Sequence, residues 1–170
     1  MTFKRTFLPA AACVAMVGLA SALPASAAEW ASWKGQDAAA PLAIYTNGTD
    51  ETGALLVCDG QGMLKAMLSL EAASLPELLE RNASYSRSTK AKIQVGDEAA
   101  ADATFRYIPA IKSIETKSHN VAAQVFNSAV LGQPLTVETK REGTVESQLP
   151  APNDTFKAFA KTCGALRNGQ

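Results

Sequence analysis

The chain has little of the side-chain chemistry on which most enzymes depend. It contains a single histidine among 170 residues, which excludes a zinc site built from several histidines. It has no GxSxG nucleophile elbow, no GxGxxG or P-loop phosphate cradle, no HExxH pair and no EF-hand loop. The lone His119 lies where a helix is predicted to start, and we expect it to be exposed and inert. The sequence therefore predicts a protein that is not an enzyme and that uses no cofactor or metal.

Long apolar runs are also lacking, except at the N-terminus. There, two basic residues precede an apolar stretch over residues 10–23, and small residues at 25–27 form the pattern that signal peptidase reads. We interpret residues 1–27 as a secretory signal peptide, with cleavage after Ala27 or Ala28. No later stretch approaches the length of a transmembrane helix. The mature chain is therefore predicted to have no membrane span and to be periplasmic or secreted.

Cysteine is scarce, and its count is informative. Of the three cysteines, Cys13 lies within the signal peptide, and a lipid-acceptor role for it is disfavoured because the apolar stretch continues past it. Cys58 and Cys163 remain in a chain bound for an oxidising compartment, so we predict a disulfide between them. Cys163 falls on the apolar stripe of the last predicted helix, so the bond would clamp that helix onto the sheet. The absence of a CxxC motif favours a structural bond over a redox pair.

Neither sign of charge dominates the mature chain. Removal of the signal peptide leaves 14 basic and 16 acidic residues, and no segment concentrates lysine or arginine. This composition argues against nucleic acid or anionic lipid as a partner. The mature chain of about 140 residues has the length of one domain. We assign residues 28–40 to an N-terminal arm and residues 41–170 to a single globular domain.

Strands are predicted where alternating or continuous apolar residues lie between turn signals. The predicted strands cover residues 41–46, 53–58, 63–70, 90–95, 103–108, 111–117, 135–139 and 144–149. Helices are predicted over residues 75–81, from Ser118 or Asn120 to Leu131, and from Asn153 or Asp154 to Gly164. The predicted fold is α+β, with mainly antiparallel strands in a sandwich or half-barrel, one crossover helix, and a C-terminal helix held by the disulfide.

Four side chains are candidates for a binding surface. Trp30 and Trp33 lie in the predicted arm, where tryptophans either dock the arm on the core or serve recognition. Lys140 and Arg141 lie at the tip of the last predicted hairpin, which we expect to be solvated. Because no catalytic constellation is present, we predict a non-enzymatic binding module whose partner is a periplasmic or envelope protein. The alternatives are an inhibitor of a secreted hydrolase such as lysozyme, a small-ligand carrier, and an enzyme with dispersed carboxylates.

The second half of the chain has a recognisable order of elements. A strand ends in a Val-Gly-Asp turn at residues 95–97, a helix ends in Leu-Gly at 131–132, and residues 134–137 read Pro-Leu-Thr-Val before a further strand and an aromatic-bearing helix. Over residues 90–166 this order resembles the invasion-associated locus B family of small exported α-proteobacterial proteins. The resemblance implies a periplasmic or surface β-sandwich with added helices and an accessory role in host interaction or envelope physiology. It implies no catalytic residues.

Overall fold

The computed structural model describes residues 28–33, 42–48, 52–72, 75–81 and 83–169. The predicted signal peptide and residues 34–40 of the predicted arm lie outside these ranges. Within them the strands are β1 Trp30–Trp33, β2 Leu42–Thr46, β3 Thr52–Cys58, β4 Leu64–Ala72, β5 Arg87–Val95, β6 Ala101–Ile108, β7 Ser113–Thr116, β8 Leu135–Thr139 and β9 Thr144–Ser147. The helices are α1 Leu75–Leu79, α2 His119–Leu131 and α3 Asp154–Asn168, with a 3₁₀ turn, Pro109–Ile111, before β7.

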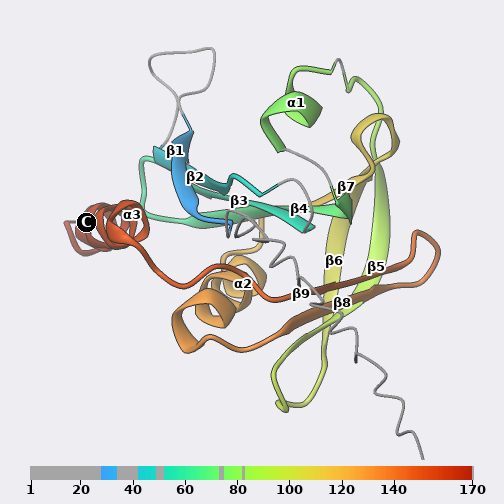
Figure 1. The fold of residues 1–170 in the computed structure, drawn as a ribbon. Helices are drawn as coiled ribbons and strands as arrows, with labels where there is room; N and C mark the ends of the chain where they lie inside the picture. Colours follow the sequence, from blue (N-terminus) through green and yellow to red (C-terminus); the bar gives the residue numbers. More distant parts are fainter. Residues whose placement is uncertain (1–27, 34–41, 49–51, 73–74, 82, 170) are drawn as a thin grey trace, which may run out of the picture.

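All of these strands belong to one antiparallel sheet, in the order β1-β2-β3-β4-β7-β6-β5-β8-β9. Figure 1 shows the sheet bending, so that β5 and β6 run across the direction of β3 and β4. The bend brings β9, at one end of the sheet, into contact with β3 and β4, but the sheet stays open. The predicted α+β fold with mainly antiparallel strands is confirmed, as a single half-barrel rather than a two-sheet sandwich.

Helix α2 is the predicted crossover helix, since it connects β7 to β8 and packs against β4, β5 and β7. Its side chains that join the main core are Ala122, Val125 and Ala129. Of the two predicted starts, Ser118 is the N-cap residue, although its side chain makes no capping hydrogen bond. Gly132 ends the helix with a φ of 63°, as predicted. The first residue, His119, is half-buried, and its Nδ1 atom accepts a hydrogen bond from the backbone N–H of Leu64 at 3.0 Å. The expectation that His119 is exposed is therefore wrong, and the expectation that it is inert stays a prediction.

Helix α3 is longer than the sequence predicts. Asn153 caps it, because its side-chain oxygen accepts a hydrogen bond from the backbone N–H of Phe156 at 3.0 Å. Gly164 is predicted to end the helix, but the helix continues through it to Asn168. Buried aromatic side chains anchor the preceding turns, and a glycine inside a helix costs only about 1 kcal/mol. The additional turn carries Arg167 toward the hairpin of β3 and β4.

Residues 30–33 form an edge strand rather than a separate arm. β1 pairs with β2 along its whole length. The Trp30 side chain is only 2% exposed, and its indole N–H donates a hydrogen bond to the Pro150 carbonyl at 2.8 Å. Its ring centroid lies 5.1 Å from that of Phe156 in α3. This part of the predicted arm is therefore integral to the sheet and its core.

A disulfide joins α3 to the sheet, which confirms the predicted pairing of Cys58 with Cys163. Cys58 at the end of β3 bonds to Cys163 in α3, and their Cα atoms are 5.8 Å apart. Both residues are buried. Because 105 positions separate them, the bond fixes the C-terminal helix against a strand near the start of the sheet.

Asp59 organises the turn between β3 and β4, which correspond to the strands predicted over residues 53–58 and 63–70. Its carboxylate accepts hydrogen bonds from the backbone N–H groups of Met63 at 3.0 Å and Gln61 at 3.1 Å, and it lies 3.3 Å from the Lys65 ammonium group. The hydrogen bond from Met63 is the main cause that lowers the pKa of Asp59 from its ordinary value. The two predicted strands are confirmed, and β3 and β4 pair across this turn.

Gly62 in the same turn lies directly against the backbone of Arg167. It has a φ of +74°, and a Cβ atom at this position would lie 2.7 Å from the Arg167 Cα atom. We expect Gly62→Ala to lower the free energy of unfolding by about 2 kcal/mol, because the turn becomes strained and the end of α3 is displaced. Gly60→Ala is the matched control, since its Cβ would meet no described atom within 4 Å. Urea unfolding measures both, and equal stabilities would contradict this contact.

Candidate functional site

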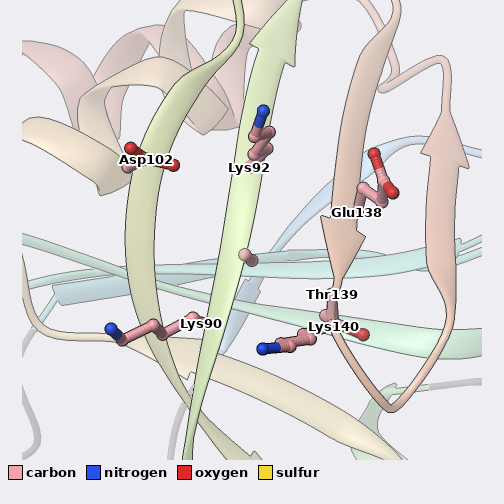
Figure 2. A pocket seen from close by; sticks show the side chains of 7 residues that line it. Lys90, Lys92, Asp102, Glu138, Thr139 and Lys140 are labelled. Carbon is pink, nitrogen blue, oxygen red and sulfur yellow. The ribbon is translucent and has the colours of Figure 1, made fainter.

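A groove of about 280 Å³ lies on the outer face of β5, β6 and β8 (Figure 2). The residues that line it are Lys90, Ala91, Lys92, Asp102, Glu138, Thr139 and Lys140. Three of these residues are lysines and two carry carboxylates, so charged side chains dominate its wall. We call this feature the lysine groove.

Strand alternation and strand order together build the lysine groove. In β5, residues on either side of Lys90 and Lys92 are buried in the core, so the two lysines point to the outer face. Because β5 lies between β6 and β8, Lys92 is opposite Asp102 on one side and Glu138 on the other. Lys140 directly follows β8, and its backbone N–H donates to the Lys90 carbonyl at 3.1 Å. The pairing of β5 with β8 thus makes Lys90 and Lys140 neighbours.

The charges are distributed unevenly along the groove. Figure 2 shows Lys90 and Lys140 at one end, and Lys92 between Asp102 and Glu138 at the other. All five residues are exposed. The salt bridges among the described residues include none of the three lysines. The groove therefore has a positive end and a mixed end, and its ammonium groups are accessible to an anionic partner.

The hairpin tip beside the positive end is held by a buried carboxylate. The side chain of Glu142 is only 2% exposed, and it lies 3.2 Å from the Arg87 guanidinium group. It also accepts a hydrogen bond from the Thr89 hydroxyl at 2.5 Å. Lys140 and Arg141 are exposed, as expected for a solvated tip. Glu142 departs from that expectation, because its ion pair and hydrogen bond tie the tip to β5.

A second hollow of about 290 Å³ adjoins the lysine groove at this tip. The two share Lys90 and Lys140, and Arg141 lines the second. The predicted binding residues Lys140 and Arg141 therefore belong to one basic surface together with Lys90. Sequence reasoning missed Lys90 and Lys92 as members of this surface. Their alternation with apolar residues signals that they share an outer face, whereas their closeness to the tip depends on strand order.

The two tryptophans predicted as binding candidates are not part of this surface. Trp30 is buried in the core, so a recognition role for it is wrong. Trp33 is half-buried, and its ring is edge-on to that of Tyr45 with 5.9 Å between the centroids. Both belong to β1, at the opposite end of the strand order from β9. The structure brings the two basic candidates together and places the aromatic candidates elsewhere.

The carboxylates of the groove do not form a facing pair. Asp102 lies on β6 and Glu138 on β8, and each is the cross-strand partner of Lys92 on β5. The strand β5 therefore lies between the two carboxylates. Within the described ranges, no three His, Cys, Asp or Glu side chains are grouped so that they could hold a metal ion. No helix of the described chain is long and apolar enough to cross a membrane. That the chain is not an enzyme stays a prediction.

Comparison of the chain with protein-family models, with curated proteins and with solved structures finds no match in any of the three. The resemblance of residues 90–166 to the invasion-associated locus B family therefore stays a prediction. Any functional assignment has to be built on the geometry and chemistry of the site itself.

Proposed function

We propose that the mature chain is an exported, non-enzymatic binding module of the bacterial envelope, and that the lysine groove holds an acidic segment of a partner protein. The observation that carries this proposal is the set of exposed lysines, Lys90, Lys92 and Lys140, which make no salt bridge to any described residue. At the positive end of the groove, the ammonium groups of Lys90 and Lys140 attract an anionic partner and speed its approach. The N-terminal signal pattern and the disulfide support export.

The scaffold beneath the groove is suited to recognition because it is held in one shape. Lys90 and Lys92 lie on a strand that is paired on both sides, and Glu142 fixes the adjoining hairpin tip. A surface of this kind loses little backbone freedom when a partner binds. Less of the favourable energy of the charge–charge contacts is then offset by the loss of backbone entropy than would be the case for a flexible surface.

A protein segment fits the charge pattern better than nucleic acid does. Asp102 and Glu138 at the mixed end would repel a continuous run of phosphates. A polypeptide can place carboxylates beside Lys90 and Lys140 and a basic or polar side chain at the mixed end. We therefore expect the partner to be a periplasmic or envelope protein that presents an acidic segment with a basic or polar residue beside it.

Reversing the charge of the groove is expected to abolish partner binding. The experiment uses tagged, exported, disulfide-bonded protein that is cross-linked in the cell envelope before purification. The combined substitutions Lys90→Glu, Lys92→Glu and Lys140→Glu should lower partner recovery by more than about tenfold, because each attraction becomes a like-charge repulsion. The isolated complex should also weaken as salt is raised, since salt screens exposed charges.

The matched control carries the same charge change elsewhere. Lys117, Lys157 and Lys161 are exposed, and they lie before α2 or in α3 rather than in the groove. Their replacement by glutamate should leave partner recovery unchanged. Undiminished binding by the groove variant, or equal losses in the two variants, would contradict the proposal.

Inhibition of a secreted hydrolase, such as a lysozyme, is a second candidate function. The observation that favours it is the hairpin tip, an exposed basic turn that Glu142 holds in one conformation. The same pair of variants tests it. Wild-type protein at about 10 μM should inhibit the enzyme, and the groove variant should not. If no lysozyme type is inhibited, this candidate is removed and the first proposal is unaffected.

A further inference from the structure

A cavity of about 190 Å³, which shares no residue with the lysine groove, lies where the β3–β4 hairpin, the start of α2 and the end of α3 meet. The residues of its apolar wall include Leu64, Ala123, Phe126 and Cys163. Its polar side includes His119 from α2 and Arg167 from α3. An apolar wall with a few converging polar groups is the usual make-up of a small-molecule site.

The position of the proton on His119 follows from its hydrogen bond. Nδ1 accepts from the backbone N–H of Leu64, and an accepting ring nitrogen carries no proton. The proton of the neutral imidazole is therefore on Nε2. Nε2 lies 3.3 Å from the Nη1 atom of Arg167, whose guanidinium group can only donate. Two donors thus face each other, and no described acceptor is hydrogen-bonded to either.

Two converging donors, one of them positively charged, form a recognition site for an oxygen anion. A carboxylate can accept from Nε2 of His119 and from the guanidinium group of Arg167 at the same time. Such charge-assisted hydrogen bonds are about twice as strong as neutral ones. Asn127 also lines the cavity, and its side-chain amide is a potential further donor.

We propose that this cavity binds a small monocarboxylate with a short apolar tail. The carboxylate lies beside Nε2 of His119 and the guanidinium group of Arg167 and accepts from both, and the tail packs against Leu64 and Phe126. An apolar cavity of about 150 Å³ holds a benzene-sized molecule, so a space of this size suits an acid of about six carbons. This inference goes beyond the lysine groove and does not depend on it.

The disulfide and the close turn keep the two donors in place. Cys163 precedes Arg167 by one helical turn, so its bond to Cys58 fixes the end of α3 against the sheet. On the other side, Gly62 lies against the Arg167 backbone. Because these contacts exist before a ligand arrives, the site does not have to be assembled when the carboxylate binds.

Hexanoate is the probe, and hexanamide is its uncharged control. Titration of the mature, oxidised protein is followed by NMR of the imidazole nitrogens, since the chain has only one histidine. Hexanoate should bind saturably with a Kd of about 1 mM or below and should shift the Nε2 signal. Hexanamide should bind at least about tenfold more weakly, because it cannot neutralise the guanidinium group.

Two substitutions test the donors separately. Arg167→Gln removes the charge at an exposed position and should weaken hexanoate binding by at least about tenfold. His119→Asn keeps an acceptor for the Leu64 N–H through its side-chain oxygen but removes the Nε2–H donor, and should weaken binding about fivefold. Lys140→Gln is the matched control in the lysine groove, and it should leave hexanoate binding unchanged.

Three results would overturn the proposal. They are equal affinity for hexanoate and hexanamide, no saturable binding of hexanoate up to about 10 mM, and an unchanged affinity in Arg167→Gln. None of these results bears on the lysine groove, since the two sites have separate residues.

Discussion

The oxidised protein is expected to be more stable than the reduced protein by about 4 kcal/mol, because the Cys58–Cys163 bond closes a loop spanning 105 positions. The bond restricts the unfolded chain, and in the folded chain it holds α3 against the end of β3. Without it, α3 keeps its contacts with β1 and β2 but is no longer covalently tied to the sheet. Urea unfolding of the same protein with and without reductant measures the difference with no change of sequence.

A variant that lacks Cys58 and Cys163 separates the bond from the side effects of the reductant. The double substitution Cys58→Ala and Cys163→Ala should reproduce the stability of the reduced wild type to within about 2 kcal/mol, the cost of truncating two buried side chains. Adding reductant to this variant should change nothing. Equal stabilities of oxidised and reduced wild type, or ready reaction of thiol reagents with the folded protein, would contradict a structural bond.

Trp30→Ala is expected to lower the free energy of unfolding by about 3 to 5 kcal/mol. The substitution removes one of the largest fully buried side chains, its ring contact with Phe156 and its hydrogen bond to the Pro150 carbonyl. Because Trp30 connects β1 to the segment before α3, its loss should weaken the packing of both β1 and α3. Urea unfolding followed by circular dichroism measures the effect.

Two further variants place bounds on the effect of Trp30. Trp30→Phe keeps an aromatic ring and loses the indole N–H, so it should cost about 1 to 2 kcal/mol and remain measurable if the alanine variant does not fold. Trp33→Ala, on the same strand but half-buried, should cost less than Trp30→Ala. A Trp30→Ala variant as stable as Trp33→Ala would show that Trp30 is not a core residue.

Cleavage after Ala27 or Ala28 stays a prediction, and both positions precede the first strand. Asn47 makes two hydrogen bonds to the backbone of Glu29, the residue before β1. Its side-chain oxygen accepts from the Glu29 N–H at 2.7 Å, and its own backbone N–H donates to the Glu29 carbonyl at 3.0 Å. Cleavage after Ala27 or Ala28 leaves Glu29 and all of β1 in the mature protein.

The elements that could be predicted are those whose own residues carry the signal. The hairpin around Asp59 has apolar strands on both sides of a turn sequence, and α2 has an apolar stripe and a terminating Gly132. The start of β5 could not be predicted in the same way. Its first residues, beginning with Arg87, are polar and form a strand only because they pair with β6. The continuation of α3 through Gly164 could not be predicted either, because it depends on tertiary packing and not on the helix propensity of the local sequence.

By itself, the sequence determined the properties that follow from composition and local pattern. If residues 1–27 are removed as the sequence predicts, two cysteines remain and only one disulfide within the chain is possible. Alternation in β5 required Lys90 and Lys92 to share a face opposite the core. Tertiary structure alone decided which distant residues meet. The lysines reach the hairpin tip because β5 pairs with β8, and His119 faces Arg167 because the disulfide and the close turn bring α3 to the start of α2. Local propensity depends on residues within a few positions, whereas these sites combine residues from separate strands and helices that only the packing of the whole chain brings together.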